Sequence, residues 1–230
     1  WSTVNSPSNT VRVNRPEDKT PSNAVHVIKP ELEIIIPSGA FSNAKTRLNL
    51  PQQQREVVCK LMFEEVIKTI SKCKLIDKII IVSKDESVLK LGKAFGAEQI
   101  FDNESGVNHA IFLADEYISD NEYDCSIIFP QDIPVMKSID IYNLLSFLKS
   151  DNSVIVVPSR QFNGTNALVR HPAKIMKPQY DMGSYRYQLD AARTETKNIS
   201  VALIRRIMLD IDDESDLAFM LKQNEKPDFC

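Results

Sequence analysis

Two cations of this chain, Lys45 and Arg47, are placed as phosphate-binding residues often are. They end a loop of small residues, PSGAFSNAKTRL (37–48), which follows the apolar segment 34–36. Loop amides at such a place can form an anion-binding concavity, and the two cations can offset phosphate charge. The GxxxxGK[ST] spacing of a P-loop is absent. A solvated loop with two ordinary surface cations is therefore the alternative interpretation.

Two segments carry carboxylates that are candidate metal ligands. Asp132 lies in FPQDIPVM (129–136), just past an apolar run, and Asp210 and Asp212 alternate in LDIDDESDL (209–217). Mg²⁺ prefers one or two carboxylates together with phosphate oxygens. Residues two apart in an extended segment point to opposite sides, so we expect one of Asp210 and Asp212 to share a metal with Asp132. A turn aspartate and an acidic helix cap are the alternatives.

Small polar residues mark further candidate ligand contacts. Gly106 and Asn108 lie in ESGVNHA, where a helix start could present amides to a nucleotide. NGTNAL (163–168) and the later pair Gly183 and Ser184 offer amides and hydroxyls that can hold a compact anion. An ordinary capped helix and a glycine turn before a strand explain these residues equally well.

The elements that must position these residues alternate between strands and helices. The predicted strands are residues 34–36, 78–82, 99–101, 125–129, 154–157, 165–169 and 200–204. The predicted helices begin near Pro51 and then cover 85–95, 105–119, 138–149, 183–195 and 213–223. This alternation is typical of an α/β fold with a mostly parallel sheet and helices on both faces. Ligands of such sheets bind beyond the carboxyl ends of the strands, where the segments after 36, 101 and 129 lie.

Composition limits the number of domains and the kinds of partner. A chain of 230 residues suits one α/β domain. Residues 1–24 are rich in Ser, Asn, Thr and Pro, which predicts a disordered or loosely ordered arm before a domain of residues 25–230. The net charge of -3 provides no positive field for nucleic acid. No apolar run approaches the roughly 20 residues of a membrane span, and no signal peptide is visible, so we expect a cytoplasmic protein.

The order of the motifs is more specific than any one of them. IPxxxxSxAKTRL, xGxNxA, PxDIP, GTNAL, GS and LDIDxxxDL follow one another over residues 33–222. This series resembles the 2-phospho-L-lactate guanylyltransferase family. The resemblance implies a single Rossmann-like nucleotidyltransferase domain, use of Mg²⁺, a homodimer, and a product that feeds coenzyme F-420 biosynthesis. The substrates it implies are GTP and a small phosphorylated three-carbon acid: 2-phospho-L-lactate, phosphoenolpyruvate or 3-phosphoglycerate.

The resemblance also implies a role for each candidate residue. The nucleotide-binding residues are Ser38, Gly39, Lys45, Arg47, Gly106 and Asn108. The acceptor-binding residues are Gly164, Thr165, Asn166, Gly183 and Ser184. The metal ligands are Asp132, Asp210 and Asp212, and the catalytic residues are Asp132, Lys45 and Arg47. The acceptor's own phosphate would attack the α-phosphorus of GTP, and with a second pKa of about 6 it is mostly dianionic at neutral pH and needs no general base.

Three departures from the family pattern keep alternatives open. Gly39 stands where the family usually has Lys, Phe162 and Asn163 stand where glycines usually precede GTNAL, and residues 213–215 replace Thr-Pro-Glu. A nucleotidyltransferase with another acceptor and a non-catalytic nucleotide-binding relative are the alternatives. The glycine-rich LxGGxSxRxGxxK loop of the related molybdopterin enzymes is absent.

Overall fold

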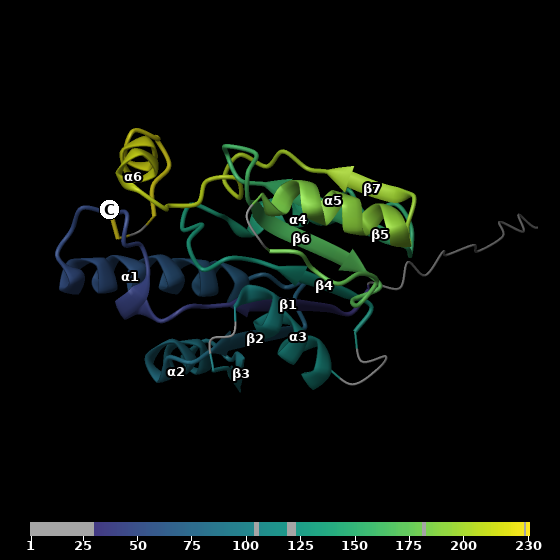
Figure 1. Ribbon diagram of the computed structural model, residues 1–230, viewed down its shortest axis with the longest axis horizontal. Helices are drawn as coiled ribbons and strands as arrows, with labels where there is room; N and C mark the ends of the chain where they lie inside the picture. The colour runs from purple at the N-terminus through teal and green to yellow at the C-terminus, as the bar shows by residue number, and fades with distance from the viewer. Residues whose placement is uncertain (1–29, 104–105, 119–122, 181–182, 228) are drawn as a thin grey trace, which may run out of the picture.

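A seven-stranded sheet forms the centre of the molecule (Figure 1). The computed structural model describes residues 30–103, 106–118, 123–180, 183–227 and 229–230, so the predicted arm 1–24 lies outside the described residues. The strands are β1 (Leu32–Pro37), β2 (Lys78–Ser83), β3 (Glu98–Phe101), β4 (Cys125–Ile128), β5 (Ser153–Pro158), β6 (Thr165–His171) and β7 (Asn198–Val201). Their order across the sheet is β3-β2-β1-β4-β6-β5-β7.

Most strand pairs are parallel, as the sequence predicts. β1 pairs in parallel with β2 and β4, β2 with β3, and β5 with β7. β6 alone runs antiparallel to its neighbours β4 and β5, because a short hairpin connects β5 to β6. The carboxyl ends of β1, β2 and β4 therefore meet at one edge of the sheet, and the amino end of β6 reaches the same edge.

Helices cover both faces of this sheet, which confirms the predicted layering. The helices are α1 (Gln52–Ser71), α2 (Glu86–Ala94), α3 (Val107–Tyr117), α4 (Ser138–Leu145), α5 (Ser184–Glu195) and α6 (Glu214–Leu221), and a 3-10 turn, η1 (Phe41–Asn43), follows β1. Side chains of α1, α2, α4 and α6 share one buried cluster, and side chains of α3 and α5 share the other. No helix in the described ranges is long and apolar enough to cross a membrane.

Strand β1 shows how the sequence produces the two layers. Ile34 and Ile36 point to the cluster under α1, whereas Ile35 points to the cluster under α3, and all three are fully buried. A strand that is covered on both faces is an uninterrupted apolar run, because alternate side chains enter two separate cores.

The last strand lies earlier than the sequence predicts. The pattern predicts a strand at 200–204, whereas β7 is Asn198–Val201. Its position is set by pairing, since Asn198 lies opposite Ser153 and Val201 opposite Val156 of β5. Leu203, which an apolar pattern favours for a strand, is 62% exposed after the strand has ended.

Candidate active site

The edge at the carboxyl ends of β1 and β4 carries the candidate site. Ser38 follows β1 directly, and its amide donates to Val82 O of β2 at 2.9 Å. Its hydroxyl donates to Gln131 Oε1, on the segment after β4. The phosphate-loop candidate and the segment that holds Asp132 are thereby joined at the rim.

Lys45 lies between two of the predicted metal ligands. Its Nζ forms an ion pair with Asp132 Oδ2 and a second with Asp212 Oδ1 at 2.5 Å. The Lys45 side chain is only 8% exposed, and its backbone φ of 56° lies in the left-handed region. Arg47 adds an ion pair to Asp212 Oδ2 at 2.6 Å from a mostly exposed position. Three segments far apart in the chain are thus brought together by charge.

These ion pairs change the protonation of the groups involved. Burial would lower the pKa of Lys45, but Asp132 and Asp212 outweigh it and raise the pKa above its usual range. Burial would raise the pKa of Asp212, but Lys45 and then Arg47 outweigh it and lower the pKa. The ammonium and the Asp212 carboxylate therefore both stay charged at neutral pH.

Asp210 differs from Asp212 in its hydrogen-bond partners and in the direction of its pKa shift. Burial first, and then the charge of the nearby Asp132, raise the pKa of Asp210 to about 6. Asn166 Nδ2 donates to Asp210 Oδ1 at 3.1 Å, and Ile211 N donates to Asp132 O at 3.0 Å. Asp132 and Asp210 thus lie near each other. The cations Lys45 and Arg47 form their ion pairs with Asp132 and Asp212.

The residues present suit a metal ion only in part. Within the described residues, no three His, Cys, Asp or Glu side chains are grouped as the ligands of a metal ion. The ammonium of Lys45 takes the place between Asp132 and Asp212 that a cation would take. Two observations nevertheless indicate a need for more positive charge. Asp132 Oδ1 is buried and has no hydrogen-bond partner in the part of the chain that the structure describes, and Asp210 lies near other carboxylates. A cation that arrives with phosphate oxygens would satisfy both.

The remaining candidate nucleotide-binding residues, Gly106, Asn108 and Gly39, differ in their surroundings. Gly106 precedes α3 with a φ of 99°, which favours glycine. The Asn108 side chain accepts a hydrogen bond from Tyr180 N at 2.8 Å, so its oxygen holds the segment before α5. Gly39 is exposed, and a Cβ built there would meet no atom within 4 Å, so no close approach of another atom requires a glycine.

The acceptor candidates form a cluster beside the carboxylates. Ser184 Oγ, on the first residue of α5, donates to Thr165 Oγ1 at 3.0 Å, and both side chains are buried. Gly183 directly precedes Ser184 and has a φ of 78°. Gly164 N donates to Ser159 Oγ at 3.0 Å within the hairpin. Asn166 donates to Asp210 and to a backbone carbonyl, so it connects the acceptor cluster to the carboxylates.

The sequence-based prediction missed two residues, Asp216 and Arg160, that hold the Asp212 segment in place. Asp216 Oδ2 accepts a hydrogen bond from Asp212 N at 3.2 Å, and Asp216 Oδ1 pairs with Arg160 Nη2 at 2.7 Å. The Arg160 guanidinium also lies 4.7 Å from the ring centre of Phe219. Asp216 is the final Asp of the motif LDIDxxxDL, so the sequence could have indicated its importance. No motif includes Arg160, which looks like an ordinary arginine in the sequence.

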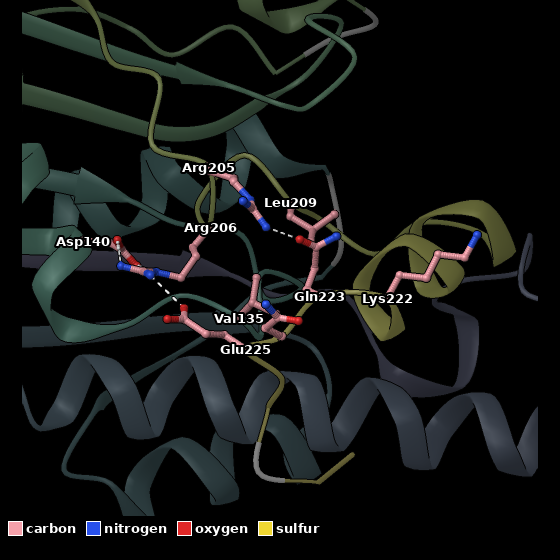
Figure 2. Close-up of a pocket in the computed structure, with 9 residues that line it drawn as sticks. Val135, Asp140, Arg205, Arg206, Leu209, Lys222, Gln223 and Glu225 are labelled. Atoms are coloured by element: carbon pink, nitrogen blue, oxygen red, sulfur yellow. Dashed lines mark hydrogen bonds and ion pairs between the residues drawn. The ribbon is translucent and has the colours of Figure 1, made fainter.

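A separate cavity of about 450 Å³ is lined by residues of the segments 205–209 and 222–225, together with Val135 and Asp140 (Figure 2). Arg206 fills one wall and holds Asp140 through Nε and Nη2, both at 2.7 Å, and Glu225 through Nη1 at 2.8 Å. Leu209, directly before Asp210, lines the same cavity. The arginine therefore anchors the irregular segment that leads to the carboxylates.

Comparison with known proteins identifies the family of this chain. A sequence model described as "Guanylyl transferase CofC like" matches residues 32–227. The chain belongs to this family. Membership of the CofC-like family confirms the predicted nucleotidyltransferase class and the resemblance read from the motifs.

Individual relatives of the CofC-like chain carry related names. It is 31% identical over 194 residues to the 2-phospho-L-lactate guanylyltransferase of Methanobrevibacter smithii, covering 83% of this chain and 84% of the relative. It is 25% identical over 186 residues to the phosphoenolpyruvate guanylyltransferase of Sphaerobacter thermophilus, covering 80% and 89%.

Solved structures support the nucleotidyltransferase fold of the CofC-like chain. The CMP:2-keto-3-deoxy-manno-octonic acid synthetase complexed with CTP matches with a TM-score of 0.56 at 12% identity, over 82% of this chain and 96% of that one. The 4-diphosphocytidyl-2C-methyl-D-erythritol synthase of Anaerococcus prevotii matches with a TM-score of 0.57 at 11% identity, over 82% and 95%. At these identities the likeness concerns the fold alone.

Proposed function

We propose that this chain transfers GMP from GTP to a small phosphorylated three-carbon acid and releases pyrophosphate. The relatives' names favour 2-phospho-L-lactate or phosphoenolpyruvate as the acid. We propose coenzyme F-420 biosynthesis as the pathway, on the basis of the family resemblance. The observation that carries the proposal is the meeting of Lys45, Asp132 and Asp212 at the carboxyl edge of the sheet. Ligands of open α/β sheets bind at this edge.

The proposed reaction is an attack by phosphate on phosphate. An oxygen of the acceptor's phosphate forms a bond to the α-phosphorus of GTP, and the bond from that phosphorus to the bridging oxygen of pyrophosphate breaks. The acceptor phosphate, with a pKa of about 6, is already mostly dianionic at neutral pH. The protein therefore needs to align two anions and neutralise their charge, and it does not need a general base.

Lys45 and Arg47 supply positive charge in this proposal. Both form ion pairs with carboxylates, and phosphate oxygens can replace a carboxylate as the partner of a cation. We expect the two side chains to turn to the triphosphate when GTP binds. This exchange would release Asp132 and Asp212 from Lys45 at the moment when the nucleotide brings its own negative charge.

Mg²⁺ is the cofactor that we propose for the released carboxylates. Asp132 would hold it through the unpartnered Oδ1, together with Asp210 or Asp212. When bound, such a metal neutralises and polarises phosphate oxygens. Asn166 keeps Asp210 oriented through its hydrogen bond, and Asp216 does the same for the Asp212 backbone.

Pyrophosphate release tests the proposed reaction directly. Purified full-length chain is incubated with GTP and Mg²⁺ and with each of 2-phospho-L-lactate, phosphoenolpyruvate and 3-phosphoglycerate. We expect pyrophosphate and a guanylylated acid of the matching mass with at least one of them. GTP binding without pyrophosphate from any acid would instead support a non-catalytic relative, for which the exposed Gly39 is the specific observation.

We further propose a homodimer in the cytoplasm. The dimer rests on the family resemblance, and the cytoplasm rests on the sequence-based expectation. No disulfide joins Cys59, Cys73, Cys125 or Cys230 in the part of the chain that the structure describes, as is usual for proteins of a reducing compartment. Size-exclusion chromatography with light scattering tests the dimer: a mass near twice 26.1 kDa supports it, and a mass near 26.1 kDa contradicts it.

A further inference from the structure

Phe162, in the hairpin between β5 and β6, has an unfavourable backbone conformation. Its φ is 57°, in the left-handed region that favours glycine and asparagine and disfavours bulky side chains. Asn163 and Gly164 come next in the chain, so residues suited to this conformation lie beside the position that requires it. A costly conformation of this kind persists only where the surrounding structure enforces it, and such residues cluster at active sites and ligand-binding segments.

Core packing does not explain the phenylalanine. Phe162 is 47% exposed. Its ring meets that of Tyr185 edge to face, with 5.8 Å between the centroids and 78° between the planes. Such a contact fixes the orientation of both rings. The two residues, called the aromatic pair below, therefore present an ordered apolar surface that is still partly open to solvent.

The aromatic pair joins the same two segments as the candidate acceptor residues. Ser184 directly precedes Tyr185, and its hydroxyl donates to Thr165 Oγ1 at 3.0 Å. Thr165 opens β6, three residues after the hairpin phenylalanine. The next residue, Asn166, holds Asp210 of the carboxylate cluster. An acceptor between these hydroxyls and the carboxylates would thus have the aromatic pair at its border.

We propose that the aromatic pair selects the acceptor acid. It favours phosphorylated acids whose remaining group is an apolar methyl or methylene, and it disfavours acids with a free hydroxyl. An apolar group gains free energy by leaving water for a ring surface, whereas a hydroxyl there loses its hydrogen bonds to water. Phosphoenolpyruvate and 2-phospho-L-lactate belong to the first kind and 3-phosphoglycerate to the second. The inference rests on the proposed guanylyltransferase function.

Phe162→Gly is the decisive variant, because glycine removes the ring and relieves the backbone. The ratio of kcat/KM for phosphoenolpyruvate to that for 3-phosphoglycerate is measured with the purified full chain. We expect Phe162→Gly to lower this ratio roughly tenfold or more, with an unchanged KM for GTP. Phe162→Tyr should keep the ratio. Phe112→Ala, which removes another exposed ring from α3, is the matched control and should also keep it.

Calorimetric titration of the same acids into the same proteins separates this inference from the proposed reaction. An unchanged ratio in a folded and active Phe162→Gly overturns the inference and leaves the reaction standing, and so does a wild type that prefers 3-phosphoglycerate. A wild type that releases no pyrophosphate, yet binds phosphoenolpyruvate with a preference that depends on Phe162, overturns the reaction alone. Failure of the wild type to bind any of these acids overturns both.

Discussion

At the scale of single residues, Lys45 is the cation that the candidate site is built around. It is nearly buried between Asp132 and Asp212. Lys45→Met should weaken GTP binding roughly ten- to a hundredfold, because hydrogen bonds to charged groups contribute about 1.5–3 kcal/mol each. The same variant should bind Mn²⁺ more tightly without nucleotide, since Asp132 loses its cation and Asp212 keeps only its ion pair with Arg47. Titration calorimetry and electron paramagnetic resonance measure the two affinities.

Arg47→Met is the matched control for Lys45. Arg47 is 66% exposed, and Asp212 is its one ion-pair partner within the described ranges, so its loss leaves Asp132 neutralised by Lys45. We expect a smaller loss of GTP affinity and little change in Mn²⁺ affinity. Equal GTP affinities for wild type and Lys45→Met would show that Lys45 is a structural cation and not a nucleotide contact.

Asp132 is the proposed metal ligand whose Oδ1 has no hydrogen-bond partner among the residues that the structure describes. Asp132→Asn keeps the volume and removes the charge, so we expect turnover to fall roughly 10²- to 10³-fold, as when other electrostatic contacts to the reacting groups are removed. Steady-state pyrophosphate release measures the effect. Circular dichroism and the melting temperature show whether the fold is kept. Near-normal turnover in a folded variant would contradict the assigned role.

At the scale of elements, the segment between β7 and α6 must be held in place from outside, because it has no regular structure around Asp210. Arg206 anchors it to Asp140 at the start of α4, and Asp140 is 3% exposed. Arg206→Gln leaves that buried carboxylate without its charged partner and should lower the free energy of unfolding by roughly 2–3 kcal/mol. Urea denaturation measures the change.

Arg205→Gln provides the comparison for this anchor. Arg205 is exposed, and its guanidinium donates to Gln223 at the end of α6. Its replacement should change stability by less than about 0.5 kcal/mol, as is usual for surface positions. Equal effects of the two substitutions would mean that the Arg206–Asp140 contact does not hold the segment.

At the scale of the whole molecule, a buried carboxyl on the central strand β1 couples stability to pH. Glu33 is fully buried, and neither of its carboxyl oxygens has a hydrogen-bond partner among the described residues. Burial raises the pKa of Glu33 to about 8, although the nearby Arg170 opposes the shift. Arg170 instead holds Asp115 with two hydrogen bonds, at 2.7 and 2.8 Å.

The sign of this coupling follows from proton binding. Between pH 4.5 and 8 the folded protein keeps the proton that the unfolded chain releases, so the free energy of unfolding falls as pH rises, by up to about 1.4 kcal/mol per pH unit. Glu33→Gln cannot ionise and should flatten this slope. Glu116→Gln, on the exposed face of α3, should leave it unchanged. Urea denaturation from pH 6 to 8.5 measures all three slopes, and parallel slopes for wild type and Glu33→Gln would refute the coupling.

The sequence by itself determined the layered α/β fold and the family. Apolar runs such as 34–36 are uninterrupted because both of their faces are buried, and that pattern is local. The motifs AKTRL, GTNAL and LDID are likewise contiguous and can be read without structure. The start of β7 escaped this reading because β5 selects it by pairing.

The tertiary structure alone decided how the candidate residues meet. Lys45 lies 87 positions from Asp132 and 167 positions from Asp212 along the chain. A local sequence pattern therefore cannot predict that the lysine lies between the two carboxylates. The anchors Arg160 and Arg206 are ordinary arginines in the sequence, and their carboxylate partners are 56 and 66 positions away. The left-handed backbone of Phe162 could not be foreseen either, because composition favours Asn163 or Gly164 for it. Contacts between distant segments depend on how the whole chain packs, and periodicity and motif order report only on neighbours in sequence.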